Sequence, residues 1–166
     1  MDNIMTRRSI RKFTNKPVSD EQIELILRAA MASPSGYNLQ PWEFIVIKER
    51  KILDKVPEFH QYTKMILESP IAIVVCCDIR EEKRKDFWIQ DCSAATQNIL
   101  LAAHALGLGA VWCGIYPVEK LVKEVQKLLK MPNYVYPVNI VPIGHPAEQK
   151  EPSDRYNEEK IHINEW

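Results

Sequence analysis

The chain has 166 residues, of which 46% are hydrophobic and 27% charged, a composition typical of one packed globular domain. Lysine plus arginine and aspartate plus glutamate each total 22, so the net charge is zero and no overall positive field exists to hold a nucleic acid. The chain opens without a signal-peptide pattern and its apolar runs are shorter than the roughly 20 residues of a membrane span, so we expect a cytoplasmic protein with no membrane segment and no nucleic-acid partner.

The first informative segment is RRSIRKF at residues 7–13, which gathers four cations around a serine. In an extended conformation Arg7, Ser9 and Arg11 share one face, and in a helix Arg7 and Arg11 do. Either arrangement lets two guanidinium groups converge on one anion, as bidentate phosphate recognition requires. A solvated basic face near the terminus is the alternative that these residues alone leave open.

The first strong helix signal follows a capping box. Ser19 is the expected N-cap, Gln22 lies three residues further on, and Val18 and Ile23 are spaced as a hydrophobic staple. The helix is expected to end before the polar, turn-rich stretch SPSGYNLQP at residues 33–41.

Two strands are predicted next. EFIVI at residues 43–47 directly follows the turn-rich loop, and IAIVVCC at residues 71–77 is an apolar run without polar alternation. Such a run is typical of a central strand covered on both faces, where the neighbouring Cys76 and Cys77 point in opposite directions. The four cysteines contain no C-x-x-C spacing, which favours buried free thiols.

The second half of the chain predicts two helices and two strands. We expect a long buried helix over residues 86–106 with Gly107 as its C-cap, a strand over 110–113, an amphipathic helix around 121–129 and a strand over 138–143. The order of all these elements predicts a layered α/β sandwich with no internal repeat and no linker.

The end of the chain raises two further expectations. Pro142 indicates that the last strand lies at a sheet edge or that the proline lies near a strand end. The tail from Gly144 onward is mostly polar, yet it finishes with the apolar residues Ile161, Ile163 and Trp166. A chain end of this kind needs a surface to lie on, and a second subunit is one candidate.

Several common functional motifs are absent. Gly107 and Gly109 follow a helix and precede a strand, and Trp112 stands where a dinucleotide-binding fingerprint has its third glycine. No G-x-x-x-x-G-K-[ST], H-E-x-x-H or G-x-S-x-G occurs. The histidines are too scattered for a metal site, so we expect structural or surface roles for His60, His104, His145 and His162 and no bound metal.

Four motif blocks together resemble the FMN-dependent nitroreductase family. They are RRSIRKF, ASPSGYNLQPWEFIVI, GAVWCGIYP, and PIGHP with DRYNEEKIHINEW, in that order along nearly the whole chain. The resemblance implies a single domain over residues 1–166, an α+β fold built as a three-layer α/β/α sandwich with a mostly antiparallel central sheet. It also implies a homodimer with one FMN in each of two interface clefts and a C-terminal arm, residues 144–166, exchanged with the partner subunit.

The resemblance assigns the basic residues to the cofactor. Arg7 and Ser9 match the ligands of the FMN phosphate, and Arg8 contributes through its backbone or its charge. Arg155 in DRY looks like a late arginine that returns to the phosphate, with Lys150 as a possible helper.

The resemblance also names residues around the flavin ring. Arg11 falls where a cation faces the pyrimidine edge, and a fixed positive charge there favours flavin reduction. The loop residues that match a segment reaching the flavin from the second subunit are Pro34, Ser35, Gly36 and Asn38.

A second group of flavin-side residues lies further along the chain. Gln61 stands about where some members carry an asparagine facing the flavin, and a surface glutamine is the alternative. Cys113, Gly114 and Ile115 fall at the segment near N5, where a backbone N–H can bond to the ring. Larger members often have an acidic residue before that glycine, so the thiol of Cys113 is either a redox partner or a passive buried group.

The activity implied is that of an FMN-dependent NAD(P)H oxidoreductase. NADH or NADPH delivers hydride to flavin N5, leaves, and a nitroaromatic, quinone or similar small-molecule acceptor is reduced in the same cleft by a ping-pong scheme. Because the cofactor carries the chemistry, the sequence identifies no obligate catalytic side chain. The alternatives are another flavin reduction on this fold, such as enone reduction or reductive dehalogenation, and a non-catalytic or sensing flavin-binding module.

Overall fold

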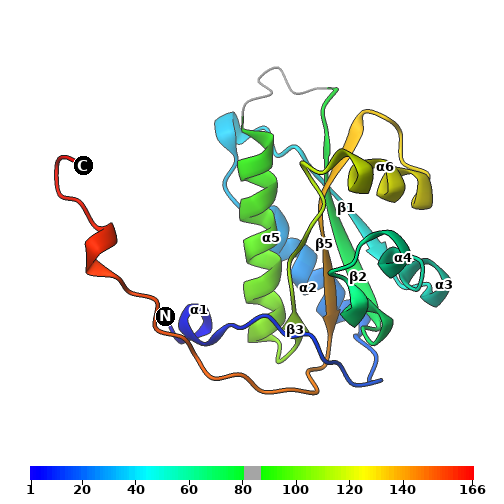
Figure 1. Cartoon of the computed structure of the whole chain (residues 1–166), viewed down its shortest axis with the longest axis horizontal. Coiled ribbons are helices and arrows are strands. Elements are labelled where there is room, and N and C mark those ends of the chain that lie inside the picture. Colours follow the sequence, from blue (N-terminus) through cyan, green and yellow to red (C-terminus); the bar gives the residue numbers. More distant parts are fainter. Residues whose placement is uncertain (81–86) are drawn as a thin grey trace.

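Five strands form one sheet with helices on both of its faces (Figure 1). The computed structural model describes residues 1–80 and 87–166. The strands are β1 (Trp42–Ile47), β2 (Ile71–Asp78), β3 (Gly109–Ala110), β4 (Cys113–Gly114) and β5 (Val135–Gly144). The helices are α1 (Asp2–Thr6), α2 (Asp20–Met31), η1 (Gly36–Asn38), α3 (Arg50–Leu53), α4 (Val56–Phe59), η2 (Lys64–Leu67), α5 (Trp88–Ala105), α6 (Glu119–Leu128) and η3 (Glu158–Lys160).

The sheet confirms the predicted α+β class. Its order is β1-β2-β5-β3, β4 also pairs with β5, and each of these strand pairs is antiparallel. The apolar run predicted as a central strand is β2, which lies between β1 and β5 with its first seven residues buried. Cys76 and Cys77 lie in different hydrophobic clusters, as alternation along a strand requires.

Two hydrophobic clusters separate the three layers. One joins α2 and α5 to one face of the sheet through residues such as Ile26 and Ile99. The other joins α3, α4 and α6 to the opposite face through residues such as Leu53, Val56 and Val122. Figure 1 shows the sheet between these two groups of helices.

The helix signals read from the sequence are confirmed. Ser19 caps α2 with the reciprocal bonds of a capping box, since its hydroxyl accepts from the Gln22 N–H and the Gln22 side chain accepts from the Ser19 N–H. The long helix is α5; the predicted start at Asp86 lies outside the described residues. Gly107 follows it with φ 71°, a conformation that favours glycine. Within the described residues no helix combines the length and the apolarity needed to span a membrane.

Two strand predictions require correction. The strand predicted over residues 110–113 is divided into β3 and β4, and the interval between them lies opposite Pro142 of β5, which has no N–H for a sheet hydrogen bond. On β3, Ser9 forms an additional parallel bridge with Ala110, and the Ile10 N–H donates to the Ala110 carbonyl at 3.1 Å. β5 is an interior strand, so the expectation of a sheet edge is wrong. The alternative expectation, a proline near a strand end, describes Pro142 better. Pro142 lies two residues before the end of β5, opposite the interval between β3 and β4.

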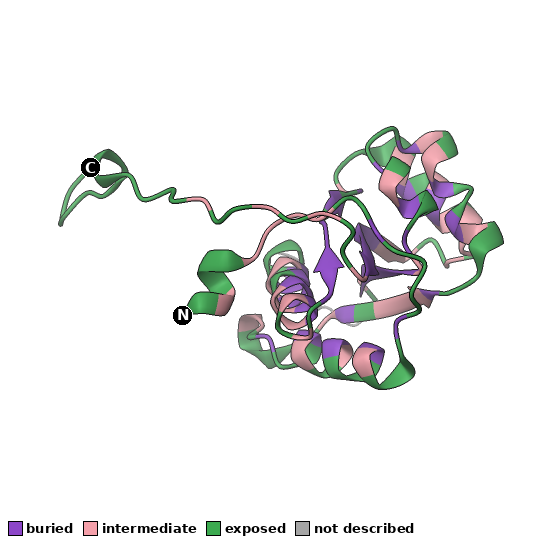
Figure 2. Cartoon of the chain, turned by 90° about the horizontal axis from the view of Figure 1, so that it is seen from below, coloured by how far each residue is buried: buried purple, intermediate pink, exposed green. Residues whose placement is uncertain are grey.

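The C-terminal segment has two parts. Its first residues stay on the body: the Thr14 N–H donates to the His145 carbonyl at 2.9 Å and the Ala147 N–H donates to the Lys12 carbonyl at 2.9 Å. From about Glu151 the chain leaves the body and is almost entirely exposed (Figure 2). The free part therefore begins later than the predicted arm, and its exchange with a partner stays a prediction.

Candidate functional site

The basic segment leaves α1 in an extended conformation that separates its side chains onto two sides. Arg7 has φ −59° and ψ 130°, and the bridge from Ser9 to Ala110 continues this extended path. Arg11 lines one cleft, whereas Arg8 and Ile10 line a depression on the other side. The alternation expected for an extended stretch therefore decides which cation faces which surface.

Three of the arginines predicted to meet the phosphate are close together. Burial lowers the pKa of Arg7, and repulsion from Arg155 and then Arg8 lowers it further. Arg8 also donates to the Glu151 carbonyl, which brings the start of the free C-terminal segment against the basic segment. Arg7 and Arg155 form no ion pair within the described residues, so the cluster carries positive charge suited to an anionic ligand.

Lys150, the predicted helper, has a structural task in this arrangement. Its ammonium group donates to the Ser9 carbonyl at 2.8 Å and pairs with Glu148 at 3.1 Å. Glu148 in turn accepts the Arg11 backbone N–H at 2.5 Å, a bond that lowers the pKa of Glu148 together with its contacts to Lys150. These contacts fix the backbone of the basic segment and leave the side chains of Arg7 and Arg11 available.

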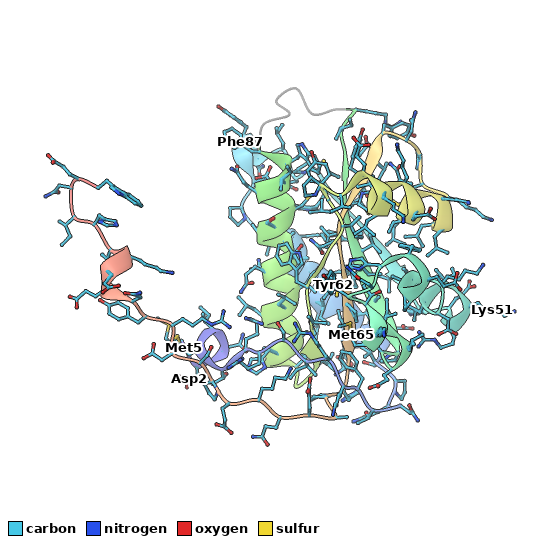
Figure 3. The ribbon with its side chains drawn as sticks, in the orientation of Figure 1. Asp2, Met5, Lys51, Tyr62, Met65 and Phe87 are labelled. Carbon is cyan, nitrogen blue, oxygen red and sulfur yellow. The ribbon has the colours of Figure 1, made fainter. Side chains whose placement is uncertain are left out.

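A cleft of about 470 Å³ lies beside Arg11. It brings together four of the predicted site residues with side chains that the sequence did not single out. Its lining residues are Arg11, His60, Gln61, Tyr62, Lys64, Met65, Val111, Trp112, Cys113 and Gly114. Figure 3 shows Tyr62 and Met65 side by side over the middle of the body. The lining carries two cations, Arg11 and Lys64, and no carboxylate among the described residues.

The floor of the cleft combines an open backbone with a neutral thiol. A Cβ atom added at Gly114 would meet nothing within 4 Å, so a flat ligand can approach the backbone there. Burial raises the pKa of Cys113 to about 11 although Arg11 opposes the shift, so the thiol is protonated at neutral pH. Ile115 contributes differently: its side chain is fully buried in the core and its N–H donates to the Val138 carbonyl at 3.0 Å.

His60 is a cleft residue that sequence reasoning missed. Its Nε2 lies 2.8 Å from the Gly114 carbonyl, and because a carbonyl can only accept, Nε2 carries the proton. The side chain is buried, so this bond holds β4 in place from the side of α4. No group of His, Cys, Asp and Glu side chains suited to a metal occurs in the described ranges.

The predicted loop residues lie far from this cleft within one chain. Gly36 rests on the first turn of α5, where its N–H donates to Asp91 Oδ1 at 2.9 Å. The N-terminal segment packs near the other end of the same helix, since the Asn3 side chain donates to the Leu101 carbonyl at 3.1 Å. The 18 residues of α5 span roughly 27 Å, and Figure 3 shows Phe87 and Met5 near its opposite ends.

The remaining loop residues also lie at this end of the molecule. Ser35 accepts the Gln40 N–H at 3.0 Å, and Asn38 accepts from the Gln40 side chain at 2.8 Å. Pro34 and Asn38 are exposed. One chain thus presents two separate parts of the predicted site: the basic segment with its cleft, and the loop around Gly36.

Comparisons with known proteins agree with this architecture. The sequence profile of the nitroreductase family matches residues 4–74 and 60–145. A protein of Methanothermobacter thermautotrophicus, provisionally named NADH dehydrogenase/NAD(P)H nitroreductase, is 48% identical over all of this chain and 87% of its own length. The structure of an FMN-dependent nitroreductase from Clostridium difficile superposes with a TM-score of 0.91 at 31% identity, covering 99% of this chain and 98% of the other.

A further solved structure contains the cofactor itself. It is a provisionally named nitroreductase from Desulfovibrio desulfuricans in complex with FMN, with a TM-score of 0.85 and 34% identity over 99% of this chain and 96% of its own. The family profile covers most of this chain, and the relative at 48% identity matches it from end to end. The chain therefore belongs to the nitroreductase family.

Proposed function

We propose that the protein is an FMN-dependent NAD(P)H oxidoreductase that reduces nitroaromatics, quinones or similar small acceptors. The observation that carries this proposal is that Arg155, from the C-terminal segment, lies close to Arg7 and Arg8 of the basic segment, whose next cation, Arg11, lines an open cleft. FMN carries a phosphate group at one end and a flat, electron-accepting ring at the other, joined by a ribityl chain. The two surfaces fit those parts in charge and in shape.

The arginine cluster suits the phosphate end of the cofactor. A planar guanidinium group can donate two parallel hydrogen bonds to two oxygens of one phosphate group. A bound dianion would also offset the repulsion that Arg7 experiences from Arg155 and Arg8. Ser9 lies on the same segment and its hydroxyl can add a hydrogen bond. Lys150 holds the Ser9 carbonyl and so sets the path of the backbone.

The cleft suits the ring end. When bound, FMN supplies hydride transfer between NAD(P)H and the acceptor. Arg11 places positive charge beside the ring position, which stabilises negative charge that develops there. Gly114 leaves its backbone uncovered, and His60 fixes the carbonyl of that residue.

A complete site requires a second copy of the chain. The loop around Gly36 and the basic segment lie at opposite ends of α5, so the two parts of one chain cannot contact the same ligand. The exposed apolar side chains of the C-terminal arm, residues 151–166, offer a surface for association. We infer a homodimer in which the loop of one subunit completes the cleft of the other.

The direct test uses the purified protein. It should be yellow or become yellow with added FMN, release FMN on denaturation, and bleach with NADH or NADPH before reoxidation by an acceptor. Protein that stays colourless after incubation with FMN contradicts the proposal. Bound FMN without NAD(P)H oxidation for any acceptor favours the non-catalytic module, and a panel of nitroaromatics, quinones, enones and halogenated substrates separates the remaining alternatives.

Two substitutions test whether Arg7 serves FMN binding and Arg11 the reduction potential of the flavin. Arg7→Ala should weaken FMN binding by roughly tenfold or more, the usual cost of losing a charge-assisted bond, with little change in reduction potential. Arg11→Ala should lower the reduction potential more than it changes affinity, because its charge faces the ring. Titration of apoprotein with FMN and a dye-coupled reduction measure both quantities, and equal effects from both variants contradict the assignment.

A further inference from the structure

Asp91 is a buried acidic residue that accepts a hydrogen bond from the backbone of the loop around Gly36. It lies in the first turns of α5 and is only 6% exposed. Its Oδ1 accepts the Gly36 N–H at 2.9 Å, and its Oδ2 has no hydrogen-bond partner within the described residues. Burying a carboxylate costs free energy unless its bonds offset the loss of water. The bond to Gly36, 55 positions earlier in the sequence, is therefore the contact that explains why an acid stands here.

The loop that Asp91 holds is strained. Tyr37, Asn38 and Gln40 have φ angles of 53°, 57° and 51°, which place three non-glycine residues in the left-handed region. Each such residue costs on the order of 1 kcal/mol or more, so surrounding contacts must maintain the conformation.

Two hydrogen bonds inside the loop help to preserve its shape. The Gln40 bonds to Ser35 and Asn38 both join one loop residue to another. The beginning of the loop is attached through Ser33, whose hydroxyl accepts from the Asn98 side chain at 2.8 Å. The tip is attached at Gly36 through Asp91.

Gly36 itself is fitted to this attachment. A Cβ atom at this position would lie 3.3 Å from Phe87, closer than most such contacts, so the backbone rests directly on that ring. Phe87 and Asp91 lie one turn apart at the start of α5, where the Asp91 N–H donates to the Phe87 carbonyl at 2.9 Å. The start of α5 thus supports the loop in two ways: the Phe87 ring packs against Gly36, and the Asp91 carboxylate accepts its N–H.

We propose that Asp91 is a positioning residue for the flavin site of the partner subunit. By accepting the Gly36 N–H it holds Ser35, Gly36 and Asn38 where they meet the cofactor bound to the other chain. Asp91 acts through the loop and does not itself contact the cofactor. The inference rests on the proposed function, since it needs both the FMN site and the dimer.

A matched pair of substitutions tests the proposal. Asp91→Asn keeps an oxygen acceptor, whereas Asp91→Leu has nearly the same shape and none. We expect Asp91→Asn to bind FMN within about threefold of the wild type and Asp91→Leu roughly tenfold more weakly, the loss typical of one hydrogen bond. Asp54→Leu, at the residue that follows α3 in the opposite layer, controls for removal of an acid and should bind FMN normally.

Thermal unfolding of the apoproteins separates positioning from general stability. Asp91→Leu leaves the Gly36 N–H without its acceptor and should lower the melting temperature, so FMN binding is compared at a temperature at which every apoprotein is fully folded. Weaker FMN binding by Asp91→Leu cannot then be assigned to unfolding. If Asp91→Leu does not fold, Asp91→Ala answers the same question. Wild-type affinity in Asp91→Leu, or equal losses in Asp91→Asn and Asp91→Leu, overturns the proposal.

Mixed dimers test whether Asp91 acts on the partner. A dimer of one Asp91→Leu and one Arg7→Ala subunit, purified with two affinity tags, should hold one site of wild-type affinity and one that carries both defects. Two equally weakened sites would show that the loop serves its own chain and would overturn the proposal. The wild type is titrated first: if it binds no FMN, the proposed function fails and this inference with it, whereas normal wild-type binding lets the variants decide the inference alone.

Discussion

The body of the molecule and its C-terminal arm, residues 151–166, use the same residue types in opposite ways. In the body Ile73 is fully buried and Trp88 is 8% exposed, whereas Ile163 is 81% exposed and Trp166 fully exposed in the arm (Figure 2). The body thus buries most of its large apolar side chains within one chain, whereas the arm leaves its own exposed. Exposed apolar side chains gathered on one segment are typical of surfaces that contact another molecule.

The largest expected difference between the two regions is in folding stability. Ile73→Ala removes a fully buried side chain from β2 and should lower the free energy of unfolding by about 3 to 4 kcal/mol, because a cavity remains. Ile161→Ala, at 52% exposure in the arm, should change it by less than about 0.5 kcal/mol. Urea unfolding at low protein concentration measures both, and similar losses would contradict the division into two regions.

The second prediction concerns association. A chain ending at Tyr156 should keep the circular dichroism of the body, because residues 157–166 are exposed throughout. Its dimer should dissociate about 100-fold more readily, equivalent to about 2.7 kcal/mol, and its FMN affinity should fall because each cleft then lacks the partner's loop. Sedimentation across a concentration series measures the dimer; a truncated chain that stays dimeric with FMN bound would falsify the role of the arm.

The third prediction concerns pH and the buried Cys113 thiol of the body. The pKa of Cys113 is raised from 9.0 to about 11 by burial, so between these values the folded state retains a proton that the unfolded state releases. Stability should therefore fall as pH rises, by about 1 kcal/mol at pH 10 from this residue. Apoprotein Cys113→Ala should lose less stability between pH 8 and pH 10 than the wild type; identical pH profiles would contradict the burial of this thiol.

Local sequence signals were sufficient for most of the fold. The capping box at Ser19 and the continuous apolar run of β2 act over a few residues, so they are legible without tertiary information. By contrast, the N-terminal segment extends the sheet at β3 through Ser9 and Ile10, which contact Ala110 from about 100 positions away. Pairing at such a distance leaves no periodic trace in either segment.

The residues of the candidate site also fall into those that local sequence signals predict and those that they do not. The density of positive charge at Arg7, Arg8 and Arg11 is a local feature, and it predicted the basic segment directly. His60 and Asp91 were missed because each acts on a backbone atom more than 50 positions away, at Gly114 and Gly36 respectively. A single histidine or aspartate has no spacing pattern that marks it as the support of a remote glycine.

The smallest expected effect is spectroscopic, and it examines the end of the arm. Trp166 is fully exposed and its ring stacks on His162 with centroids 4.4 Å apart, so in a dissociated chain iodide should quench its fluorescence freely. Association should shield this residue, and the difference between wild type and Trp166→Phe isolates its emission from that of the other three tryptophans. Trp112→Phe is the control, because Trp112 lines the cleft and its emission should respond to FMN. If Trp166 stays equally quenchable at concentrations where the protein is dimeric, the arm associates without burying its end, and the apolar contacts of the dimer must come from residues closer to the body.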